Sequence, residues 1–231
     1  MTDIGYEFVS PTVRIVTPES ELKAAVSRIA EMGRICYQSV PKGDADADEK
    51  FVRALIDRQH ESVLEHGCMT VVMVTGRTVT HQLVRHRLAS YSQESQRYCN
   101  YSLGKFDSTI KFVPPASFSS WDEEHKELFE KLVEESCAAY GRLLDGGVKP
   151  EDARGVLPQC VKTQIAVTAN FREWRTIAKL RCAKNAQADI RALVNAVVKA
   201  TTPVLGSIWG GIDMYDDDIA DYEVPVVPGG L

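Results

Sequence analysis

The sequence QLVRHRLASYSQESQRY, residues 82–98, gathers Arg85, His86, Arg87 and Arg97 in one short region. The chain as a whole is acidic, with 27 Lys and Arg against 32 Asp and Glu and a net charge of −5. Guanidinium groups form forked, charge-assisted hydrogen bonds with phosphate and carboxylate groups, and nearby serine hydroxyls can add further bonds. The segment therefore predicts a local binding site for an anion.

Backbone geometry suggests how one ligand could use this segment. If the chain is extended here, alternate side chains share a face, so Gln93, Ser95 and Arg97 would point the same way. The alternative is a solvent-exposed face of surface ion pairs. The acidic total argues against a protein that binds nucleic acid along its whole surface. We expect no membrane span either, because no apolar run approaches the roughly 20 residues that a bilayer requires.

Helical and strand-like spacing on either side of the segment predicts one α+β domain, and we expect a mainly antiparallel sheet flanked by helices. Helical spacing covers residues 19–37, a stretch ending near 60, and 78–87, 121–144, 171–180 and 187–201. Residues 68–74 and 162–168 read as strands, Gly76 ends the first of them, and residues 90–101 read as extended or looped. Asn170 is a candidate N-cap. Strands and helices do not alternate regularly, which disfavours a doubly wound fold.

The two ends of the sequence and its cysteines give further predictions. From about residue 215 the sequence is acidic and contains Pro225 and Pro228, which is typical of a loosely held tail. Six scattered cysteines without a C-x-x-C pair predict reduced thiols. The first residues lack a secretory signal pattern, so we expect a cytoplasmic protein.

The order of residues in the arginine-rich segment resembles a known signature. The pattern R-H-R-x-x-S-x(4)-S-x-R is similar to that of flavin-dependent thymidylate synthases. The resemblance continues in HESVLEH (60–66), ARGVLP (153–158), NFR (170–172) and LR (180–181), and covers roughly residues 50 to 195. Ser92, Gln93 and Asn185 depart from the residues that are frequent in the family.

The resemblance implies reductive methylation of dUMP to dTMP, with FAD as cofactor and NADPH and 5,10-methylenetetrahydrofolate as co-substrates. It also implies a homotetramer whose sites combine several subunits. The residues expected around dUMP are Gln82, Leu83, Val84, Arg85, Gln93, Glu94, Ser95, Gln96, Arg97 and Arg154. Those expected to hold FAD are His60, Ser62, Glu65, Arg85, His86, Arg87, Gln93, Asn170, Arg172 and Thr176.

Arg181 is the residue that the resemblance implies as the activator of the pyrimidine. The uracil ring is a weak nucleophile at C5, and a fixed cation that stabilises negative charge on the ring would increase its reactivity. The alternative is that Arg181 only caps or ion-pairs the end of its helix.

A metal site is a weaker hypothesis. His60, His66, His81 and His86 do not form the H-E-x-x-H pattern that places two ligands one helical turn apart. A structural, hydrogen-bonded histidine is the usual alternative. We expect no metal.

Two other functions remain as alternatives. A cysteine nucleophile would use Cys99 or Cys182, although no cysteine lies within the arginine cluster itself. An RNA-binding module could stack bases on Tyr91, Tyr98 and Tyr101 beside the arginines, but there is no RNP-like pattern. The chain also lacks G-x-G-x-x-G, so a Rossmann dinucleotide site is not indicated.

Overall fold

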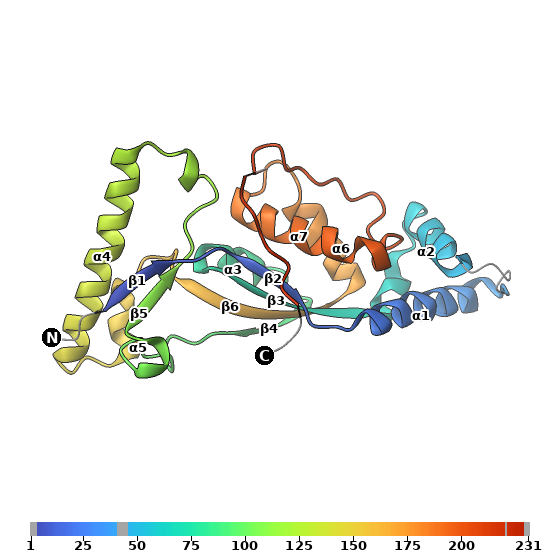
Figure 1. Ribbon diagram of the computed structural model, residues 1–231. Helices are drawn as coiled ribbons and strands as arrows, with labels where there is room; N and C mark the ends of the chain where they lie inside the picture. The colour runs from blue at the N-terminus through green and yellow to red at the C-terminus, as the bar shows by residue number, and fades with distance from the viewer. Residues whose placement is uncertain (1–3, 41–45, 220, 229–231) are drawn as a thin grey trace.

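The computed structural model describes residues 4–40, 46–219 and 221–228 (Figure 1). A four-stranded antiparallel sheet has the order β2-β3-β6-β4, and a separate pair of parallel strands joins β1 to β5. The strands are β1 (Gly5–Phe8), β2 (Thr12–Ile15), β3 (Cys68–Gly76), β4 (Ala89–Gln93), β5 (Thr109–Phe112) and β6 (Lys162–Asn170). The prediction of an α+β domain with a mainly antiparallel sheet is confirmed.

Strands β3 and β6 form the centre of the sheet, and along most of each strand the buried and less buried side chains alternate. In β3 the side chains of Met69, Val71 and Met73 are buried on one face, while those between them are half-buried on the other. The two strands pair over their whole lengths, from Cys68 opposite Asn170 to Gly76 opposite Lys162. This long ladder fixes the positions of the segments that follow each strand.

Helices cover the sheet on the face of its main hydrophobic core (Figure 1). This group contains α1 (Glu19–Tyr37), α2 (Ala47–Asp57), α3 (Arg77–Leu83), α6 (Phe171–Arg181) and α7 (Ala188–Leu205). At the other end of the molecule, α4 (Glu123–Asp145) and α5 (Pro150–Ala153) pack with β1 and β5 around a second hydrophobic cluster. Short 3₁₀ helices complete the chain: η1 (Glu61–His66), η2 (Gly104–Phe106), η3 (Phe118–Ser120) and η4 (Arg154–Val156).

Most predicted helices are found close to their expected bounds. The N-cap predicted at Asn170 is confirmed, since its Oδ1 accepts a hydrogen bond of 2.9 Å from the Glu173 amide. The helix predicted over residues 78–87 is too long, because α3 ends at Leu83. The Tyr91 hydroxyl donates to the carbonyl groups of Leu83 and His86, at 2.8 and 2.7 Å, and so satisfies acceptors where the helix stops.

The extended or looped segment predicted at residues 90–101 is confirmed, but its geometry differs from expectation. Strand β4 ends at Gln93, and the amides of Tyr98 and Cys99 then turn back to the Ser95 carbonyl, at 3.1 and 2.9 Å. The prediction that Gln93, Ser95 and Arg97 share one extended face is therefore wrong, because the alternation stops before Ser95.

The segment from Tyr215, which composition marks as a loosely held tail, makes specific contacts with the rest of the chain. The Asp218 carboxylate accepts from Arg191, and Asp216 pairs with Lys199 at 2.7 Å. Further on, residues 225–227 hydrogen-bond to Val13 of β2, and Val226 forms a parallel bridge with it. In the described residues, the helices are too short or too polar to cross a membrane.

Candidate functional site

The arginine loop, residues 84–88, connects α3 to β4. Arg85 and Arg87 are exposed, and within the described chain neither guanidinium has a hydrogen-bond or ion-pair partner. The side chain of His86, between them, is turned into the protein and is almost fully buried. The loop thus presents two unpaired guanidinium groups to an anionic ligand. Its imidazole makes its contacts inside the protein.

Arg181, the last residue of α6, turns its half-buried guanidinium back toward this loop. Its Nε donates to His86 Nε2 at 3.1 Å, and its Nη2 donates to the Gln82 carbonyl at 3.2 Å. A guanidinium carries five N–H donors, so three remain for a ligand. Arg181 therefore lies beside Gln82 and His86, which are more than ninety residues away in the sequence.

A buried carboxylate lies on the other side of His86. Glu173 Oε1 is 3.9 Å from His86 Nδ1, and both side chains are more than nine-tenths buried. Burial and the charge of Arg181 lower the pKa of His86 below its ordinary value, while burial raises that of Glu173. Burial, with the nearby Glu173, also raises the pKa of Tyr91 to about 12. His86 is therefore neutral near pH 7.

Gln82 links this cluster to α7. Its side-chain amide donates to the Gln187 side chain, whose own amide donates to Asp189 at 3.0 Å. Asp189 also accepts from the Ala116 amide at 3.1 Å, and burial raises the pKa of its carboxyl. These contacts hold the α3 end of the site against a buried helix.

The turn after β4 and η4 form a second basic group, near the Lys162 end of β6. Arg97 Nε donates to the Glu151 carboxylate at 3.1 Å, and Arg154 Nε donates to the Glu151 carbonyl at 2.9 Å. Glu94 pairs with Lys162 at 2.7 Å. One acidic residue therefore brings together two arginines that sequence reasoning assigned to the same ligand.

The other residues expected near dUMP differ in accessibility. Gln93 is committed to the protein, since its amide donates to the hydroxyls of Thr80 and Thr163 at 3.1 and 3.2 Å. Leu83 and Gln96 are buried, whereas Val84 is exposed. Leu83 therefore packs in the main hydrophobic core of this chain.

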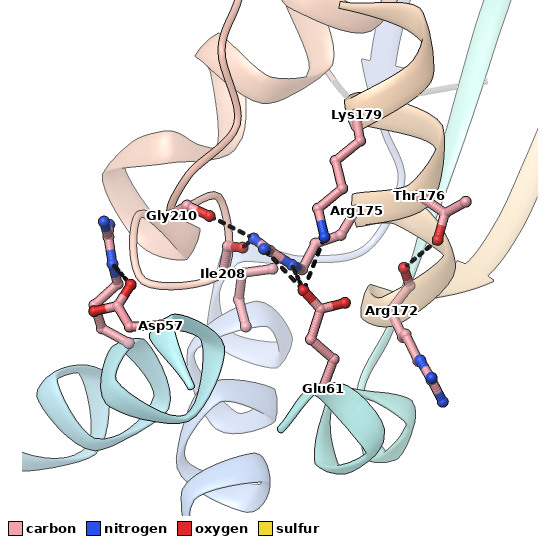
Figure 2. Close-up of polar contacts among 9 residues, drawn as sticks. Asp57, Glu61, Arg172, Arg175, Thr176, Lys179, Ile208 and Gly210 are labelled. Atoms are coloured by element: carbon pink, nitrogen blue, oxygen red, sulfur yellow. Dashed lines mark hydrogen bonds and ion pairs between the residues drawn. The ribbon is translucent and has the colours of Figure 1, made fainter. Parts of the chain in front are cut away.

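The residues expected near flavin lie mainly where η1 meets the start of α6. Glu65 and Arg172 form an exposed ion pair of 2.6 Å. The Thr176 hydroxyl donates to the Arg172 carbonyl at 3.1 Å (Figure 2). His60 Nδ1 is hydrogen-bonded to the Tyr37 hydroxyl. Ser62 is exposed.

Sequence reasoning missed the ion network that supports this region. Glu61 Oε1 receives Arg175 Nη2 at 3.1 Å and Lys179 Nζ at 2.9 Å, while Arg175 Nη1 also donates to the carbonyls of Ile208 and Gly210 (Figure 2). The side chain of Arg175 is 3% exposed. A signal was present, since position 175 falls on the apolar face of α6 with Phe171 and Ala178, and a charge there predicts a buried partner.

These groups do not all converge within one chain. β6 has nine residues and spans about 27 Å between its end residues at the usual rise per residue. Arg97 and Arg154 lie near its Lys162 end, and Arg172 follows its Asn170 end. The arginine loop lies toward the Asn170 end, because Ala89, which follows it, pairs with Ala169, and His86 faces Glu173 in the first turn of α6. Arg181 contacts this loop through His86.

A family model described as thymidylate synthase complementing protein matches residues 20–205. The chain belongs to this family. The match includes the arginine loop, η1, η4 and all of α6, and so contains every candidate site residue.

Relatives in this family carry the name flavin-dependent thymidylate synthase. The one from Geobacter sulfurreducens is 37% identical over 200 residues, covering 84% of this chain and 82% of the relative. The one from Pyrococcus furiosus is 38% identical over 169 residues, covering 73% and 67%. A third, from Mycobacterium sp. strain KMS, is 33% identical over 220 residues, covering 85% and 84%.

The cysteines and the potential metal ligands bear on two other chemistries considered from the sequence. Burial raises the pKa of Cys182 to about 12, so the thiolate that a nucleophile requires is not formed near pH 7. Cys99 is half-buried. Among residues 4–40, 46–219 and 221–228, no three His, Cys, Asp or Glu side chains are grouped to ligate a metal ion.

Proposed function

We propose that this member of the family converts dUMP to dTMP by reductive methylation, with FAD, NADPH and 5,10-methylenetetrahydrofolate. The observation that carries the proposal is Arg181, held by two hydrogen bonds beside a loop with two unpaired arginines, in a chain whose relatives are named for this activity. Cytoplasmic location remains a prediction.

The hydrogen-bond donors of the site suit FAD and dUMP, which both carry phosphate. Arg85 and Arg87 offer ten N–H donors with no competing acceptor in the described chain, and guanidinium groups bind phosphate in forked geometry. The Ser62 hydroxyl and the exposed Arg172 can add donors for FAD, which supplies hydride transfer when bound. Arg172 would exchange its exposed pairing with Glu65 for phosphate at little cost, because such pairs contribute about 0–1 kcal/mol.

For the nucleotide, Arg97 and Arg154 would bind the phosphate, and Gln82 and Arg85 would orient the ring. Glu151 keeps the two arginines together before the ligand arrives. Its carboxylate is partly exposed, so a dianionic phosphate can displace it from Arg97.

Arg181 would stabilise the ionised N3 to C4 edge of the uracil. Its three remaining N–H groups can donate to the developing charge, and its two protein contacts fix their direction. Electrostatic stabilisation of this kind is strongest when the donor is already oriented and partly shielded from water.

The complete site would be assembled in a homotetramer. The separation along β6 argues that phosphate-binding residues at one end and flavin-binding residues at the other meet through a second subunit. The sheet face opposite the helices supports this, because Val72, Val74 and Ala166 there are only half-buried in one chain. Such apolar faces are commonly covered in an assembly.

The proposed activity predicts a yellow protein after reconstitution with FAD. Its absorbance should bleach anaerobically with NADPH and return when methylenetetrahydrofolate and dUMP are added, with dTMP as product. A folded protein that binds no FAD, or binds it and makes no dTMP, would contradict the proposal.

Subunit complementation tests the shared site. Arg97→Ala and Arg172→Ala alter opposite ends of β6, and each alone should make little dTMP. If sites combine subunits, refolding the two variants together should restore up to about a quarter of the sites, because half of the phosphate ends and half of the flavin ends are intact. No recovery in mixed oligomers, or a fully active monomer by light scattering, would refute sharing.

A further inference from the structure

The contact between Arg181 and His86 determines the protonation state of the imidazole. A guanidinium only donates hydrogen bonds, so His86 Nε2 must present its lone pair to the Arg181 Nε–H group. The neutral tautomer with this property carries its proton on Nδ1, the nitrogen that faces Glu173. An imidazolium ion has no lone pair and could not accept this bond.

The surroundings of the ring preserve that arrangement. The Tyr91 hydroxyl donates to the carbonyls of Leu83 and His86, which fixes the backbone from which the ring projects. Glu173, about two turns before Arg181 on α6, has its carboxylate 3.9 Å from Nδ1, and its side chain is also buried. The imidazole is thus held from β4, α3 and α6 together.

We propose that neutral His86 is a positioning residue for Arg181, fixing the direction in which the guanidinium presents its three free N–H groups to the pyrimidine. The proposal rests on the proposed function and deepens it. The resemblance implies His86 as a contact of FAD, whereas the buried ring gives its side chain a different partner. His86 would act through Arg181, without contact to the substrate.

This role makes pyrimidine activation sensitive to acid. The charged or titratable groups facing His86 are Arg181 and Glu173 from α6, with the neutral Tyr91 from β4. Burial and Arg181 lower the pKa of His86, so the neutral form persists below pH 6.5, and protonation at still lower pH removes the acceptor and repels Arg181.

Nuclear magnetic resonance of ¹⁵N-histidine-labelled protein tests the contact without any activity. We expect the His86 signal at pH 8 to show an unprotonated Nε2 and a protonated Nδ1, with a titration midpoint below 6.5. Arg181→Ala should raise that midpoint, because it removes a positive charge next to the ring. A proton on Nε2, or a midpoint unchanged by Arg181→Ala, would overturn the proposal.

Three variants test the consequence for catalysis. His86→Gln can place an amide oxygen near the position of Nε2 and does not titrate, whereas His86→Leu removes the acceptor and keeps similar bulk. We expect dTMP formation within about threefold of wild type for His86→Gln, and about 10²-fold lower for His86→Leu, as for a misplaced catalytic group. His125→Gln, on the exposed start of α4, is the control and should match wild type.

Flavin content, flavin reduction by NADPH and the pH profile separate this role from others. Both His86 variants should keep normal flavin content and reduction, and His86→Gln should lack the acid limb seen in wild type. Equal losses in both variants, loss of flavin in either, or near-normal dTMP formation by His86→Leu would overturn the proposal. If wild type itself makes no dTMP, the proposed function fails, and the resonance experiment still decides the contact.

Discussion

Glu61→Gln is expected to destabilise the chain although it preserves the size of the side chain. The substitution removes the counter-charge of Arg175, whose side chain is 3% exposed, and leaves that charge facing the carbonyls of Ile208 and Gly210 alone (Figure 2). Breaking a buried ion pair costs about 3–5 kcal/mol, and we expect about 3 because Glu61 keeps some contact with solvent.

A loss of about 3 kcal/mol in the free energy of unfolding gives a measurable decrease in melting temperature. For a chain of this length 1 kcal/mol corresponds to about 2–4 °C, so Glu61→Gln should melt about 6–12 °C lower. The assay is thermal unfolding of FAD-free protein at neutral pH, followed by circular dichroism at one protein concentration, because assembly alters apparent stability.

A matched exposed pair provides the control. Asp57 and Arg53 form an ion pair of 3.0 Å on α2, with both side chains about half exposed, so Asp57→Asn should lower the melting temperature by only about 1–2 °C. If Glu61→Gln melts within about 2 °C of Asp57→Asn, the buried network does not carry the stability assigned to it.

The difference in stability between wild type and Glu61→Gln should depend on pH, and the pKa of Glu61 gives the direction. Burial alone would raise the pKa of Glu61, but hydrogen bonds and charges from Lys179 and Arg175 outweigh it and lower the pKa below 4.5. A lowered folded-state pKa stabilises the fold above pH 4.5, and this contribution is lost as pH falls through the folded value. The difference between wild type and Glu61→Gln should therefore shrink in that acid range.

Three further outcomes are expected. Arg181→Ala should lower dTMP formation by about 10²–10³-fold while flavin reduction stays normal, and turnover within threefold of wild type would reassign pyrimidine activation. Gly67→Ala should cost about 1–3 kcal/mol in urea unfolding, because its Cβ would meet the Phe171 ring at 2.7 Å; an unchanged midpoint would contradict this. Asp218→Asn should speed proteolytic cleavage after residue 215, because it weakens the pairing with Arg191; equal cleavage rates would count against that contact as an anchor.

Long, regular segments of this chain could be predicted from the sequence. Helices α1 and α4 show several turns of apolar spacing, and β3 and β6 have enough residues to show alternation. Strands β1, β2 and β5 have four residues each, and their pairing depends on partners distant in sequence. No local pattern could identify them.

Some features of the candidate site could likewise be proposed from the sequence, and others could not. Order along the chain was enough to propose Arg85 and Arg87 from the signature and Arg181 from the LR match at residues 180–181, and these roles stay predictions. The inward turn of His86 could not be predicted, since it depends on Glu173 and Arg181 approaching from another element. The end of β4 at Gln93 depends likewise on the turn that follows it.

The bridge between Val13 and Val226 has a consequence for biosynthesis. Strand β2 borders the sheet, and an unpaired strand edge invites association with other chains. Its protecting partner is more than two hundred residues away, so a ribosome must add all of these residues after β2 before this border closes. During translation the nascent chain therefore carries an open edge, and rapid completion or chaperone cover would protect it from aggregation.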